Sequence, residues 1–186
     1  MPKSPAQAND NSQEAAFKQF FDASLLAQLK SAYTHKGVEH IKTFEQLETF
    51  LTKGIKDIYS HTERFKQMSE FLEKLSEKLD KFRNNIVTED KPRLKNIENI
   101  DIAINSAANN GDNYRVKDLQ YLKAVPDILE QSGKLSEISK KLAENLSKME
   151  ASNQHTVQHV TRPSQSKAGS EAAPDLKPDS SRKPTR

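Results

Sequence analysis

The sequence contains no cysteine and no tryptophan, and it has only five glycines in 186 residues. Without cysteine there can be no disulfide, thiolate nucleophile, zinc–thiolate site or iron–sulfur cluster. The shortage of glycine argues against Rossmann, P-loop and β-rich folds, which use glycine at tight turns and at close backbone approaches. Apolar residues make up 34% of the chain, so the core that it can bury is modest.

Long apolar runs are also missing, because no stretch of 18 consecutive apolar residues occurs. No transmembrane helix is therefore expected. The residues that follow Met1 are polar and are unlike a secretory signal. We expect the protein to be cytoplasmic, or to be exported by a route that needs no cleavable signal peptide.

The C-terminal segment differs in composition from the rest of the chain. Residues 152–186 carry the whole net charge of +3 and four of the eight prolines, whereas residues 1–151 balance 23 basic against 23 acidic side chains. Only Val157, Val160 and Leu176 supply branched or aromatic apolar side chains there, too few to offset the entropy of ordering. We therefore expect disorder over residues 1–11 and 152–186, with an α-helical bundle over residues 12–151.

The strongest pattern in the sequence is a heptad repeat that begins beside a capping box formed by Thr43 and Gln46. Apolar residues occupy almost every a and d position of one register over six heptads, which is typical of a coiled-coil-like helix. We call this set the apolar seam, and its members are Phe44, Leu47, Leu51, Ile58, Phe65, Met68, Leu72, Leu75, Leu79, Phe82 and Ile86.

Two d positions of the apolar seam are not apolar, namely Gly54 and His61. His61 is a candidate polar layer of the kind that fixes register. Two arrangements fit the seam: one continuous helix over residues 43–87, or two helices with a hinge near residues 59–60. The uninterrupted register favours the continuous helix. In either case we expect part of the seam to remain exposed, because the flanking helices are short.

The remaining helices are predicted from apolar residues at helical spacing. A first helix is expected over residues 12–36, with Gly37 as a left-handed C-cap. Residues 88–92 should end the long helix, since Pro92 suits only the first turn of the next one. Pro126 should kink or restart a later helix, and Gly133 should separate it from the last one. No useful period-2 alternation occurs, so the fold class is all-α: an elongated bundle or coiled-coil-like hairpin with a long central helix.

The sequence shows no constellation that would support catalysis or hold a cofactor. The glycine-rich nucleotide motifs, the HExxH and GxSxG motifs and the EF-hand loop are all missing. His155 and His159 have the spacing of metal ligands on a helix, but no third ligand stands near them. We therefore expect no enzymatic activity, no cofactor, no metal and no small-molecule substrate.

The function that these observations favour is that of a helical protein–protein interaction module. It would act as an adaptor, an assembly subunit or a secreted effector, and would bind a protein partner or a second copy through the apolar seam. The alternative is binding to a nucleic acid or an anionic surface through the C-terminal segment, although its basic residues are scattered among acidic ones. These basic residues are Arg162, Lys167, Lys177, Arg182, Lys183 and Arg186.

Overall fold

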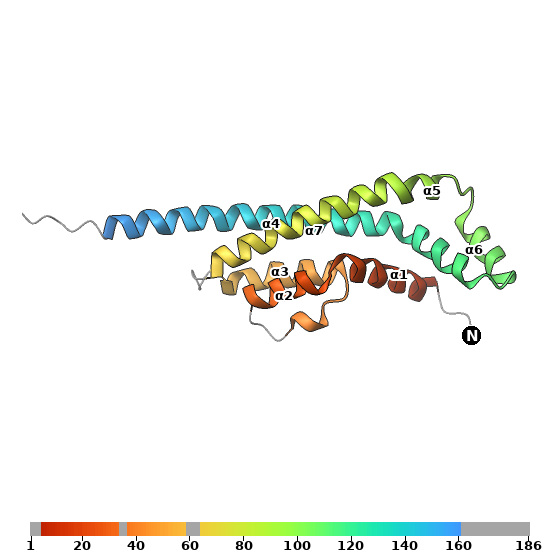
Figure 1. The fold of residues 1–186 in the computed structure, drawn as a ribbon, viewed down its shortest axis with the longest axis horizontal. Coiled ribbons are helices and arrows are strands. Elements are labelled where there is room, and N and C mark those ends of the chain that lie inside the picture. The colour runs from red at the N-terminus through yellow and green to blue at the C-terminus, as the bar shows by residue number, and fades with distance from the viewer. Residues whose placement is uncertain (1–4, 34–36, 59–63, 161–186) are drawn as a thin grey trace, which may run out of the picture. The chain divides into compact units, whose positions relative to one another are not determined.

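A computed structural model describes residues 5–33, 37–58 and 64–160, and all the regular structure in these ranges is helical. The predicted all-α bundle is confirmed. The chain divides into two units, Met1–Glu150 and Ala151–Arg186, and the bundle belongs to the first. The helices of the described ranges, shown in Figure 1, are α1 (Pro5–Phe20), α2 (Ala23–Ala32), the short 3₁₀ turn η1 (Val38–His40), α3 (Phe44–Ile58), α4 (Phe65–Asn85), the π-helical turn η3 (Ile86–Asp90), α5 (Lys91–Lys95), α6 (Ile100–Asn109) and α7 (Asn113–Val160).

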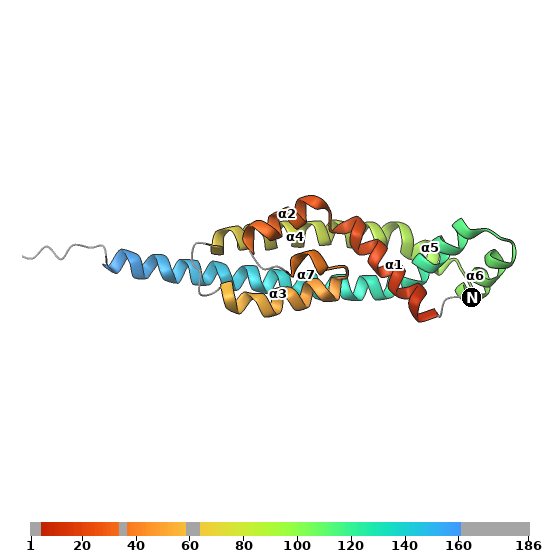
Figure 2. The same cartoon turned by 90° about the horizontal axis from the view of Figure 1, so that it is seen from below.

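The apolar seam lies on two antiparallel helices and not on one. The rings of Phe44 at the start of α3 and Phe82 near the end of α4 have their centroids 5.7 Å apart. In one continuous helix these residues would be separated by about 57 Å. The chain therefore reverses between α3 and α4, as Figures 1 and 2 show. The continuous helix is wrong; the proposed hinge at residues 59–60 and His61 lie outside the described residues.

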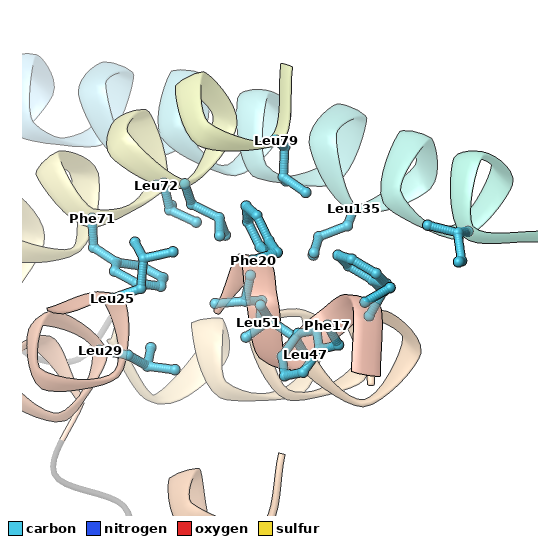
Figure 3. Close-up of a cluster of buried hydrophobic side chains, with 14 of the residues drawn as sticks. Phe17, Phe20, Leu25, Leu29, Leu47, Leu51, Phe71, Leu72, Leu79 and Leu135 are labelled. Atoms are coloured by element: carbon cyan, nitrogen blue, oxygen red, sulfur yellow. The ribbon is translucent and has the colours of Figure 1, made fainter. Parts of the chain in front are cut away.

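The seam side chains form the core of the bundle. Its buried members are Phe44, Leu47, Leu51, Phe65, Met68, Leu72, Leu75, Leu79 and Ile86, whereas Phe82 is half-buried and the side chain of Ile58 is outside the described set. Figure 3 shows them meeting α1, α2 and α7 through Phe17, Phe20, Leu25, Leu29 and Leu135. Of the described seam members only Phe82 stays partly exposed, so over these residues the seam is not the exposed apolar ridge that we expected. Apolar residues recur at this spacing in any helix that packs through one face. The spacing alone therefore could not distinguish an exposed apolar surface from a buried core.

The N-terminal region contains two helices where one was expected over residues 12–36. α1 ends at Phe20, and Asp22 caps α2 through a hydrogen bond that its Oδ1 accepts from the Leu25 backbone N–H at 2.9 Å. α2 ends at Ala32 with Tyr33 as its C-cap, and Gly37 has a right-handed φ of −86°. The expected left-handed cap at Gly37 is therefore wrong. The Thr43–Gln46 capping box is present in part: the Gln46 N–H donates to Thr43 Oγ1 at 3.2 Å, but Gln46 Oε1 accepts from the Lys42 N–H at 2.8 Å.

The two outer helices extend beyond the expected limits of the bundle. α1 begins at Pro5, and α7 ends at Val160. Residues 5–11 and 152–160, for which we expected disorder, are thus described as helical, while residues 1–4 and 161–186 lie outside the described ranges. Scarcity of apolar side chains limits packing, but a turn added to an existing helix needs no new nucleation.

Pro92 lies in the first turn of a new helix, as the sequence predicts, but the connection from α4 is a helical turn instead of an irregular break. The backbone stays right-handed from α4 through η3 into α5, and Pro92 occupies the first turn of α5. A proline ring clashes with the carbonyl four residues earlier in a regular α-helix. The wider π turn over Ile86–Asp90 immediately precedes the proline, and Thr88 Oγ1 donates within it to the Asn84 carbonyl at 2.9 Å. The local change of winding replaces the predicted break.

The long helix of the structure is α7, which passes through both Pro126 and Gly133. The predicted interruption at Gly133 is wrong. A Cβ added at Gly133 would lie 3.0 Å from Nη2 of Arg83 in α4, so the glycine makes room for this guanidinium. Ser136 and Lys140, one and two turns later in α7, both donate to Asp80 Oδ1 in α4, at 3.1 and 3.4 Å. Packing against α4 outweighs the low helix propensity of glycine.

Substitution of the seam by a charged residue should unfold the bundle. Leu72→Asp or Leu75→Asp places an unpaired carboxylate where the side chain is wholly buried, with an expected loss of more than about 4 kcal/mol. Glu70→Ala and Lys74→Ala, on the exposed side of α4, should cost less than about 0.5 kcal/mol. Urea unfolding measures both. Equal tolerance at the two kinds of position would contradict the core assignment.

Gly54, one of the two interruptions of the seam, is expected to be required for packing. A Cβ at this position would lie 2.7 Å from the Tyr33 hydroxyl oxygen and 2.8 Å from its Cζ. Because Tyr33 is buried, its ring has little room to move, and Gly54→Ala should cost about 1–3 kcal/mol. Gly133→Ala is the matched control, since it meets only the flexible end of Arg83 and should gain up to about 1 kcal/mol from helix propensity. Thermal unfolding in which Gly54→Ala is also stabilising would refute this packing.

Candidate functional site

An apolar pocket of about 530 Å³ lies on the N-terminal part of the bundle, between α1, the beginning of α2 and the segment that contains η1. We call it the α1–η1 pocket. Its lining residues are Asn11, Glu14, Ala15, Phe17, Lys18, Phe21, Leu26, Val38, Glu39, Ile41 and Lys42. Four of the α1 residues, Asn11, Glu14, Ala15 and Lys18, follow the spacing of one helix face.

The corner between α1 and α2 positions one side of this pocket, and Asp22 fixes that corner. Its backbone is extended, with φ −77° and ψ 174°, which ends α1 and redirects the chain into α2, as Figure 2 shows. Its Oδ2 also accepts a hydrogen bond from Lys78 Nζ of α4 at 2.8 Å. The bond to Lys78 and that to the Leu25 N–H hold the pKa of the Asp22 carboxyl below its ordinary value. Along the chain, Phe21 directly precedes this anchored residue and Leu26 follows it.

The floor of the pocket is apolar and only partly covered. The Phe17 and Phe21 rings are stacked, with centroids 5.1 Å apart and an interplanar angle of 16°. Phe17 and Val38 are buried, whereas Phe21, Leu26 and Ile41 are half-buried. The bundle therefore leaves three large apolar side chains partly in water around one hollow, which is more informative than the same residues scattered singly.

The polar lining of the pocket is balanced in charge. Glu14 and Lys18 stand on the α1 side, and Glu39 and Lys42 stand on the η1 side. The Glu39 carboxylate accepts a hydrogen bond from Lys30 Nζ at 2.7 Å, and this contact lowers the pKa of Glu39. With two acids and two bases in the lining, the pocket has no net charge that would select a strongly acidic or strongly basic ligand.

A second polar cluster joins η3 and α5 to α7. The Tyr121 hydroxyl donates to Asp90 Oδ2 at 3.0 Å, and Arg93 bridges Asp90 and Asp118 with distances of 3.3 and 2.6 Å. Burial, with the bond to Asp90, raises the pKa of the Tyr121 phenol and keeps it protonated. This cluster ties elements together and offers no activated nucleophile. Over the described residues no group of three His, Asp or Glu side chains is arranged to hold a metal ion.

The residues proposed from the sequence do not form a common exposed site. The seam members that the structure describes belong to the core, and His61 and all six basic residues of the C-terminal segment lie outside the described ranges. The pocket was not predicted from the sequence. Its signal was the Asp22-Ala23-Ser24 stretch, which favours a helix N-terminus in the middle of an apolar stripe.

Comparison with protein-family models, curated proteins and solved structures gives no significant match for this chain. None of the helices in the described ranges combines the length and hydrophobicity that crossing a bilayer requires.

Removal of the Asp22 side chain should loosen the corner that shapes the pocket. Asp22→Ala loses the N-cap and should cost about 1 kcal/mol, whereas Asp22→Asn retains a capping oxygen and should cost less. Because the folded-state pKa of Asp22 is lowered, its charge stabilises the fold above pH 3.8, and this contribution is lost as the pH falls through the lowered pKa. Unfolding curves of the wild type and Asp22→Asn should therefore converge in acid. A constant difference down to pH 2 would contradict this role.

Proposed function

We propose that the protein is a non-enzymatic helical interaction module whose binding surface is the α1–η1 pocket. The pocket receives apolar side chains from a helix of a protein partner. The observation that carries this proposal is the partly open floor formed by Phe21, Leu26 and Ile41. The buried seam serves as the support that holds α1 and α2 in place, and is no longer the proposed contact surface.

The pocket suits a helix that inserts a few anchors and contacts the surrounding rim. Complete burial of a large apolar side chain contributes about 1.5–3 kcal/mol, so three half-buried ones supply on the order of 3 kcal/mol. A dissociation constant near 1 µM requires about 8 kcal/mol. Contacts along the α1 face and with the charged rim must therefore supply the rest, and a helix lying in the groove makes both kinds of contact.

A pair of adjacent substitutions on α2 tests the pocket. Leu26→Glu places a carboxylate in the apolar floor, and Ala27→Glu introduces the same residue at an exposed neighbour. We expect tagged wild-type protein and Ala27→Glu to retain the same protein partner from a lysate, and Leu26→Glu to lose it at least tenfold. Quantitative mass spectrometry gives the retained amounts, and circular dichroism confirms that both variants are folded. Equal retention by the two variants would contradict the proposal.

A further inference from the structure

We infer that the helix received by the α1–η1 pocket is α1 of a second copy of this chain, so that two copies pair through a two-fold axis with their α1 helices antiparallel. This inference rests on the proposed function, because it uses the same pocket. A two-fold interface is self-complementary: if one residue meets another across it, the second also meets the first.

The charges on the exposed face of α1 have the pattern that such a pair needs. Glu14 and Lys18 are both exposed, are four residues apart and therefore lie on the same face of the helix. In an antiparallel pair, the register that sets Glu14 opposite the second copy's Lys18 also sets Lys18 opposite its Glu14. The antiparallel arrangement thus forms two ion pairs, each between oppositely charged side chains. A parallel pair in the same register brings side chains of like charge together.

The apolar residues agree with this register. It places Phe21 of each copy opposite Asn11 of the other, and Asn11 lines the pocket. Phe21, the residue after α1, is half-buried in the floor of its own pocket, and its uncovered part adds an apolar contact at each end of the pair. Ala15, which is exposed between the two charged residues, is small enough to let the helices approach closely.

The charge balance of the bundle favours a partner of its own kind. Residues 1–151 carry equal numbers of acidic and basic side chains, so two copies do not repel one another at long range. The pocket lining is also neutral, with two acids and two bases. A strongly acidic or strongly basic partner gains no net electrostatic attraction at this lining. A second copy carries the same alternation of acidic and basic side chains and can pair each with its opposite.

Charge reversal at the two α1 positions provides the test, with sedimentation equilibrium of the full chain from about 1 to about 100 µM. Wild-type protein should dimerise within this range. Glu14→Lys and Lys18→Glu should each weaken self-association at least tenfold, because each sets two like-charged pairs against one another. An equimolar mixture of the two variants should dimerise again, since every facing pair then has opposite signs. Glu70→Lys, the same charge change on exposed α4, should leave the dimer unchanged.

Each other outcome overturns the inference. A wild type that stays monomeric excludes the second copy as occupant, and the proposed function then stands only if Leu26→Glu still loses a different protein partner. Failure of the mixture to recover dimerisation excludes the antiparallel register. A Glu70→Lys variant that is as impaired as Glu14→Lys shows a general charge effect. A dimer that tolerates Leu26→Glu forms elsewhere, and this result contradicts the inference, while the proposed function then depends on the loss of a different protein partner by Leu26→Glu.

Discussion

The bundle depends on the contact of Phe44 with aromatic rings from two other helices. Its ring centroid lies 5.2 and 5.6 Å from those of Phe17 and Phe20 in α1, and 5.7 Å from that of Phe82 in α4. Phe20 and Phe82 also meet, at 5.5 Å. Aromatic pairs contribute about 0.5–1.5 kcal/mol beyond the area that they bury, so this cluster binds the N-terminal helix to the α3–α4 pair. Loss of a buried phenylalanine ring costs about 3–5 kcal/mol, and at Phe44 that loss would affect all three helices.

The α1–η1 pocket follows from this cluster. Phe17 belongs to both the core and the pocket. Its ring makes a T-shaped contact with Phe44 in the core and a stacked contact with Phe21 in the pocket. The core thus fixes where α1 runs, and the Asp22 cap fixes where α1 ends. What remains open is the strip that neither α2 nor η1 covers. A buried seam and a partly exposed pocket are therefore two consequences of the same packing.

The sequence predicted the helical class and the composition of the core, but not how its helices connect. Apolar spacing identifies Leu47, Leu72 and Leu75 as facing a partner helix, because periodicity reports burial on one face. It does not report the direction of the chain, so it could not decide between one continuous helix and two helices joined near residues 59–60. Glycine misled at Gly133, where α7 continues and packs against Arg83, whereas Pro92 begins a new helix as predicted, after a π turn in place of an irregular break. The pocket was missed because it arises from segments that meet only in the fold.

The central claim is that the α1–η1 pocket is the interaction surface and that the apolar seam is core. Hydrogen–deuterium exchange of the full chain at low and high protein concentration compares the two directly, because association protects the backbone that it covers. We expect α1 and residues 37–42 to gain protection at high concentration, while α3 and α4 exchange equally slowly in both samples. Added protection confined to α3 and α4, with none in α1, would show that the seam is the contact surface and would contradict the account.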